Sequence, residues 1–120
     1  MEFNQQSRNR NSIISLQNSE VKLAHTLLKT PCFISPNYYS ETNIRTLEAI
    51  DKPSIFALMT KDNIDLLIIG TGHHGALLHP KQQIALQQMG VSTESMNSQA
   101  ACRSFNLLLS DARLVGLLLL

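Results

Sequence analysis

The sequence has no tryptophan, few aromatic residues and little charge, and these shortages exclude several classes of protein. Charged residues make up 16% of the 120 residues and the formal net charge is +1, so no electrostatic attraction to nucleic acid or to an anionic membrane is expected. The two cysteines, Cys32 and Cys102, lie far apart and match no metal-binding or redox spacing. They favour reduced thiols in a cytoplasmic protein, and a single disulfide is the alternative.

Long hydrophobic runs are also missing. The apolar run at 114–120 is much shorter than the about 20 residues of a membrane-spanning helix, so we expect it to be core and predict no membrane span. Residues 1–11 are polar and lack the apolar segment of a signal peptide. They are predicted to form a disordered polar tail before a single domain at 12–120. A cytoplasmic location follows as the expectation.

Hydrophobic residues make up 43% of the chain, which is enough for the core of one domain. Pro53 and Pro80 each suit the first turn of a helix, and Ile55, Phe56 and Met59 are expected to form the buried face of the first helix. In chain order, we predict strands at 12–16, 21–25 (extendable to 29), 32–35 and near 44–47, a helix at 53–60, a strand at 64–69, a helix at 80–89, a strand at 91–96, a helix from 97 or 98 to 110, and a strand at 113–120.

Two strand-to-loop passages point to a site. The strand at 64–69 runs into Gly70-Thr71-Gly72, and the strand at 91–96 runs into Asn97 and Ser98, one of which is expected to cap the next helix. Because one helix joins the two strands, they should form a right-handed crossover and a parallel pair. Both passages then lie at the same edge of the sheet. They would form a crevice lined by backbone N–H groups, where open α/β sheets usually hold ligands.

Taken together, these blocks resemble a family of small α/β domains. The family includes bacterial and archaeal proteins of unknown function, the mitochondrial complex I assembly factor 3 and an adipogenesis-associated protein. The resemblance covers roughly residues 12–120, and the order and spacing of its blocks are more specific than Gly-Thr-Gly alone. It is carried by Gly70-Thr71-Gly72, the helix that begins at Pro80, Gly90-Val91, Met96-Asn97-Ser98, the segment 100–106 and Arg113.

The resemblance implies a single three-layer α/β domain. Its central mixed sheet would have about five strands, with an N-terminal β-hairpin, helices packed on the sheet and the C-terminal strand inside it. No established reaction comes with the family. The family usually has Met-Asp-Thr where this chain has Met96-Asn97-Ser98, and Arg-Thr-Tyr-Asn where it has Arg103-Ser104-Phe105-Asn106. An aspartate and a tyrosine hydroxyl that a catalytic role would use are therefore absent.

Several groups near the crevice are capable of chemistry, but they form no convincing catalytic set. His73, His74 and His79 could bind zinc, yet adjacent histidines rarely converge on one ion, and solvated loop histidines are the preferred interpretation. Cys102 could be a nucleophile, but a small buried side chain that lets its helix pack closely is preferred. The segment 70–72 could bind phosphate but lacks the lysine of a P-loop. The alternative is that its glycines are needed because the backbone takes positive φ where it leaves the strand. We predict no catalytic residue, no metal site and no cofactor.

Arg103 is the charged residue most relevant to the crevice. It lies about one and a half turns into its helix, where it could bond the carbonyl groups of the 70–72 loop or face the crevice and bind a carboxylate or phosphate through two hydrogen bonds. Asn106 shares its helix face by i,i+3 spacing. The predicted ligand-binding residues are Gly70, Thr71, Gly72, His73, Asn97, Ser98, Arg103 and Asn106.

Two hypotheses from different classes result. The first is a non-catalytic interaction or assembly-type module that binds a protein partner, which the resemblance links to assembly of a respiratory complex. The second is a small-molecule anion-binding domain or enzyme that uses the crevice at residues 70–74 and 96–106. An exposed apolar patch away from the crevice favours the first, and an inward-facing Arg103 favours the second.

Overall fold

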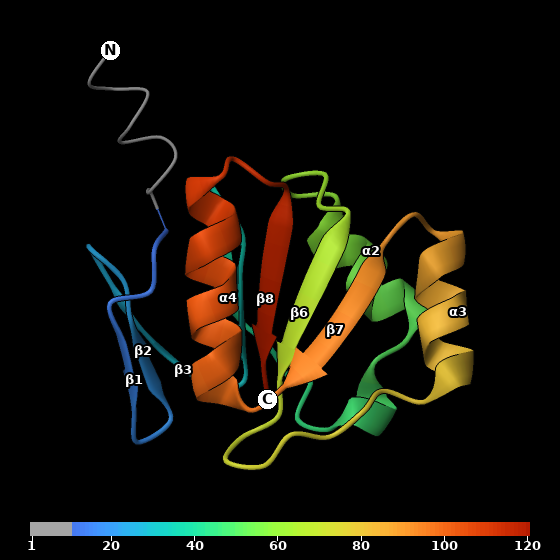
Figure 1. Ribbon diagram of the computed structural model, residues 1–120, viewed down its shortest axis with the longest axis horizontal. Coiled ribbons are helices and arrows are strands. Elements are labelled where there is room, and N and C mark those ends of the chain that lie inside the picture. Colours follow the sequence, from blue (N-terminus) through green and yellow to red (C-terminus); the bar gives the residue numbers. More distant parts are fainter. Residues whose placement is uncertain (1–10) are drawn as a thin grey trace.

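The central sheet is built from strands that are distant in the sequence (Figure 1). The structure is a computed structural model and describes residues 11–120. Along the sheet the strand order is β5-β4-β8-β6-β7, with β4 antiparallel to both neighbours and β6 parallel to both of its own. The five strands are β4 (Cys32–Ile34), β5 (Tyr39–Glu41), β6 (Leu66–Gly70), β7 (Ser92–Met96) and β8 (Val115–Leu119).

Burial on both faces explains why the inner strands are continuous apolar runs. Every residue of β6 and β8 is buried. Leu118 of β8 is fully buried and pairs in register with Phe33 on one side and Ile69 on the other. The predictions of a mixed five-stranded sheet, of a parallel β6–β7 pair and of a C-terminal strand inside the sheet are therefore confirmed.

Two layers cover the faces of this sheet, as the three-layer prediction requires. Helix α4 (Ser98–Ser110) packs on β6 and β8 together with the residues of a small second sheet. On the opposite face lie η1 (Leu47–Ala49), α2 (Lys52–Met59) and α3 (Pro80–Gln88) (Figure 1). The alternation along β6 supplies both cores: Ile68 packs on the α4 side, and Ile69 packs on the α2 and α3 side.

The second sheet contains the predicted hairpin and one further strand. Its antiparallel order is β1 (Ser15–Gln17), β2 (Glu20–Lys22) and β3 (Leu27–Lys29). Asn18 and Ser19 make the hairpin turn, with φ of 53° and 63°. The prediction that the second strand continues to residue 29 is wrong. The Leu23 N–H donates to the Thr26 carbonyl at 2.9 Å, so the chain reverses there and β3 returns alongside β2.

Two other local predictions are also wrong. No strand forms at 44–47, because the partner of β4 is the nearer segment β5, which returns after a turn closed by the Ser35 N–H and the Tyr38 carbonyl at 2.8 Å. Phe56 is exposed although Ile55 is fully buried. A helix turns by about 100° per residue, so the step from Ile55 to Phe56 rotates the side chain away from the sheet.

The predicted polar tail falls mostly outside the described residues. Residues 1–10 lie outside them, and the structure places Asn11 in the domain, where it is buried and its side-chain amide donates to the Ser35 carbonyl at 2.8 Å. Within residues 11–120, no helix combines the length and the apolar character needed to cross a bilayer.

Candidate functional site

The three parallel strands end together at one edge of the sheet. The Thr71 N–H, just past β6, donates to the Met96 carbonyl of β7 at 2.9 Å, and the Leu120 N–H, just past β8, donates to the Gly70 carbonyl at 3.0 Å. The carboxyl ends of strands are where open α/β folds usually hold ligands. The structure thus brings together the two strand-to-loop passages that the sequence predicted to be neighbours.

The start of α4 is tied to the loop that follows β6. Asn97 caps the helix, and its Oδ1 accepts from the Ala100 N–H at 2.9 Å, which confirms the predicted cap. The Ser98 N–H donates to the Gly72 carbonyl at 2.8 Å, and the Gly72 N–H donates to Ser98 Oγ at 2.8 Å. Of the N–H groups that open this helix, those of Ser98 and Ala100 therefore have partners within the protein.

The two glycines of the Gly-Thr-Gly segment serve different purposes. Gly72 has φ of +84°, the positive value that the sequence suggested for a tight exit from the strand. Gly70 is required by space instead. A Cβ at Gly70 would lie 2.5 Å from Leu119 Cδ2 and 2.9 Å from Ser98 Oγ. The missing side chain lets α4 begin directly against the end of the sheet.

Thr71 and His79 organise the loop between β6 and α3. The Thr71 hydroxyl lies 2.7 Å from the His74 carbonyl oxygen, to which it donates, and accepts from the Ala76 N–H at 3.1 Å. His79 caps α3, with its Nδ1 accepting from the Lys81 N–H at 3.1 Å. No group of three metal-ligating side chains gathers anywhere in the described residues.

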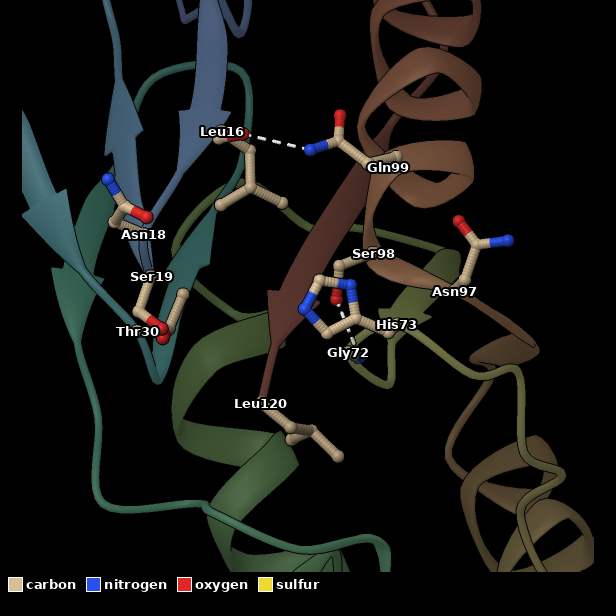
Figure 2. Close-up of a pocket in the computed structure, with 10 residues that line it drawn as sticks. All are labelled: Leu16, Asn18, Ser19, Thr30, Gly72, His73, Asn97, Ser98, Gln99 and Leu120. Atoms are coloured by element: carbon tan, nitrogen blue, oxygen red, sulfur yellow. Dashed lines mark hydrogen bonds between the residues drawn. The ribbon is translucent and has the colours of Figure 1, made fainter.

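A pocket of about 270 Å³ opens beside these strand ends (Figure 2). Four predicted ligand-binding residues line it: Gly72, His73, Asn97 and Ser98. Sequence reasoning missed the other wall, which consists of the β1–β2 hairpin and its surroundings. The turn pattern at 17–20 predicted the hairpin, but no local sequence pattern indicates that the hairpin packs beside the strand ends. The missed lining residues are Leu16, Asn18, Ser19, Thr30, Gln99 and Leu120.

Arg103 and Asn106 do not line this pocket. Arg103 is exposed, and its guanidinium makes no hydrogen bond to the rest of residues 11–120. Asn106 holds the start of the domain to α4, since its Oδ1 accepts from the Ile13 N–H at 2.7 Å and its Nδ2 donates to the Ile13 carbonyl at 2.9 Å. A ligand-binding role for the predicted set stays a prediction, and its geometric support is confined to the residues at the pocket.

Both cysteines are buried, free thiols. Burial raises the pKa of Cys32 to about 12, and the nearby Cys102 and Glu41 add to the rise. Burial also raises the pKa of Cys102 to about 11, against a smaller opposite effect of Arg103. A nucleophilic cysteine needs a lowered pKa, so the structure favours the interpretation of Cys102 as a small buried side chain.

Comparison with known protein families gives one match over nearly the whole domain. A family model described as "Protein of unknown function (DUF498/DUF598)" matches residues 13–120. The mouse protein named NADH dehydrogenase [ubiquinone] 1 alpha subcomplex assembly factor 3 is 31% identical over 88 residues, which is 72% of this chain and 47% of that protein. The chain therefore spans about half the length of the curated relatives it matches.

Solved structures share the fold at low sequence identity. A crystal structure from Bordetella parapertussis has a TM-score of 0.80 at 24% identity, covering 92% of this chain and 94% of that one. A Mth938-like domain from Bordetella pertussis has a TM-score of 0.76 at 20% identity, covering 95% of this chain and 86% of that one. Similarity at this level of identity establishes the architecture alone.

Proposed function

The chain belongs to the family described as protein of unknown function (DUF498/DUF598), and on that basis we propose that it is a non-catalytic domain that binds protein partners during assembly of a larger complex. The name of the mouse relative supports this class of role. From the similarity to that mouse assembly factor, we propose that the partners are subunits of a respiratory NADH dehydrogenase. The cytoplasmic location expected from the sequence stays a prediction.

An exposed apolar pair on the α4 side carries the proposal. Ile14 is 58% exposed and Leu107 is 66% exposed. Each directly follows one member of the hydrogen-bonded pair Ile13 and Asn106, so their backbones lie close together on the α4 side. We call Ile14 and Leu107 the α4 apolar pair. Large apolar side chains that gather on a surface mark interaction sites more often than scattered ones do.

The backbone beneath the α4 apolar pair is held in place before any partner binds. The Asn106 amide bonds both backbone groups of Ile13, and the Ile14 N–H donates to the Lys22 carbonyl of β2 at 2.8 Å. A preorganised surface loses less conformational entropy on association. This supports docking of a partner without rearrangement of the domain.

Site-specific photo-crosslinking tests the proposal. A benzophenone amino acid is placed at position 107, and in a matched variant at position 84, because Ile84 is a comparably exposed (56%) apolar residue on α3 of the opposite face. After irradiation in cells, adducts at position 107 should contain NADH dehydrogenase subunits, and position 84 should give none. Equal adducts at both positions, or none with that complex at either, would contradict the proposal.

Anion binding at the pocket, the second hypothesis, has weaker support. The N–H groups of Ser98 and Ala100 already donate to protein oxygens, and Arg103 is not among the pocket residues. A helix start attracts anions chiefly through N–H groups that lack partners. The hypothesis remains a prediction that phosphate titration can decide.

A further inference from the structure

Among residues 11–120, no lysine, arginine, aspartate or glutamate lines the pocket at the strand ends. We propose that it holds an uncharged anchor of an extended partner segment, an apolar side chain together with its own backbone amide. The inference rests on the proposed partner-binding function, and it adds the chemistry of what the partner inserts.

Charge is the first reason. Moving an ion out of water is unfavourable unless an opposite charge or several hydrogen bonds replace the water. Within the described part of the chain, His73 is the only titratable side chain in the lining. The N–H groups of Ser98 and Ala100 are already bonded within the protein. The pocket therefore offers a carboxylate or a phosphate little to replace its hydration.

Hydrogen-bonding capacity is the second reason. The Asn18 amide and the Ser19 and Thr30 hydroxyls line the pocket but make no side-chain hydrogen bond to residues 11–120, and Figure 2 shows these three side chains gathered on one wall. Amides and hydroxyls both donate and accept. They match the N–H and C=O groups of a peptide, which also come as donor and acceptor together.

Size and apolar surface complete the match. Leu16 belongs to the hairpin wall and Leu120 follows β8, so the pocket has apolar groups from two different elements (Figure 2). Its volume of about 270 Å³ is just under the ~300 Å³ at which pockets for drug-sized ligands begin. The space suits one anchoring residue, and a longer segment would continue over the surface outside it.

Two small probes that differ only in charge test the inference. N-acetyl-leucinamide is neutral, and N-acetyl-leucine carries a carboxylate. Each is titrated into the whole protein while backbone amide NMR signals are followed. The neutral probe should shift the amides of Ser19, Gly72, His73 and Gln99, and the anionic probe should bind at least ~10-fold more weakly, a factor that corresponds to ~1.4 kcal/mol.

Variants locate the binding. Thr30→Val keeps the side-chain shape and removes the hydroxyl, and Asn18→Gly removes the amide while glycine tolerates the positive φ of that turn position. Both should weaken binding of the neutral probe. Thr46→Val is the control, because Thr46 is exposed and lies outside the pocket.

Three results would overturn the inference: no shifts with the neutral probe at millimolar concentration, equal or tighter binding of the anion, or unchanged binding in both pocket variants. None of these would bear on partner binding at the α4 apolar pair. Crosslinking at position 107 would still report that function separately.

Discussion

Ser98 and Gly72 hold each other through two reciprocal hydrogen bonds, each of 2.8 Å. The Ser98 N–H donates to the Gly72 carbonyl, and Ser98 Oγ accepts from the Gly72 N–H. The first residue of α4 is thereby fixed to the loop after β6, although the two residues are 26 positions apart in the chain. Both residues line the pocket, and the link occupies the Ser98 N–H that an anion at the helix start would otherwise use.

Removing the Ser98 hydroxyl should loosen this link. Ser98→Ala leaves the Gly72 N–H without its partner and should lower the free energy of unfolding by about 1 kcal/mol. Urea denaturation measures the loss, and hydrogen exchange at Gly72 should accelerate. Ser110→Ala is the control, since its hydroxyl donates to the Leu107 carbonyl at the exposed end of the same helix. An equal decrease in the free energy of unfolding in both variants would show that the Ser98–Gly72 hydrogen bonds stabilise the protein no more than an exposed hydroxyl does.

Adding a methyl group at Gly70 should be more harmful than adding one at Gly75. The new Cβ of Gly70→Ala would lie 2.5 Å from Leu119 Cδ2 and 3.1 Å from the Ser98 Cα, and overpacking of this kind costs roughly 1–3 kcal/mol. At Gly75 the nearest atom is the Asn97 backbone nitrogen at 3.6 Å, an ordinary contact. Thermal unfolding should therefore separate Gly70→Ala from Gly75→Ala, and equal melting temperatures would contradict the close packing.

A charge in the middle of β8 should unfold the domain. Leu118→Asp places an unpaired carboxylate among fully buried residues. Burying that charge costs about several kcal/mol, a large share of the roughly 5–15 kcal/mol by which a typical domain is stable. Leu114→Asp is the control, because Leu114 is 46% exposed and precedes the strand. Circular dichroism should show a folded Leu114→Asp and an unfolded Leu118→Asp. If Leu118→Asp folds with an unchanged melting temperature, β8 is not part of the core.

The cysteines should be unreactive in the native state. Folding raises the pKa of Cys32 from 9.0 to about 12 and that of Cys102 from 9.0 to about 11. Ellman's reagent at pH 8 should label neither thiol until the protein is denatured. Because the unfolded thiols lose their protons first, their contribution to stability is complete below pH 9. It is lost as the pH rises from 9 to about 11 for Cys102 and from 9 to about 12 for Cys32. Rapid labelling of native Cys102 would instead support a role for this residue as a nucleophile.

Sequence reasoning succeeded where a local pattern determines structure. The apolar runs around Ile68 and Leu118 indicated strands buried on both faces. The polar pair Asn97 and Ser98 before a helical segment indicated that one of them caps the helix, and the cap is Asn97. Each of these features depends on burial or on hydrogen bonds between residues close in sequence, so the pattern is visible without the fold.

The missed features depend on contacts between distant segments. Thr30 and Asn18 line the pocket only because the second sheet packs beside the start of α4, where Gln99 Nε2 donates to the Leu16 carbonyl at 2.8 Å. Helical spacing placed Arg103 and Asn106 on one face, but it could not tell which of them contacts the protein. The structure answers this through Ile13, which takes both hydrogen bonds of the Asn106 amide.

The most direct test of the central claim measures assembly of the NADH dehydrogenase complex in cells that lack this protein. The complex is quantified on native gels after complementation with the wild type, with Leu107→Glu or with the matched Ile84→Glu, and each variant is first shown to fold. We predict that the complex is depleted without the protein, returns with the wild type and Ile84→Glu, and stays depleted with Leu107→Glu. A normal amount of complex in the absence of the protein, or full rescue by Leu107→Glu, would contradict the account.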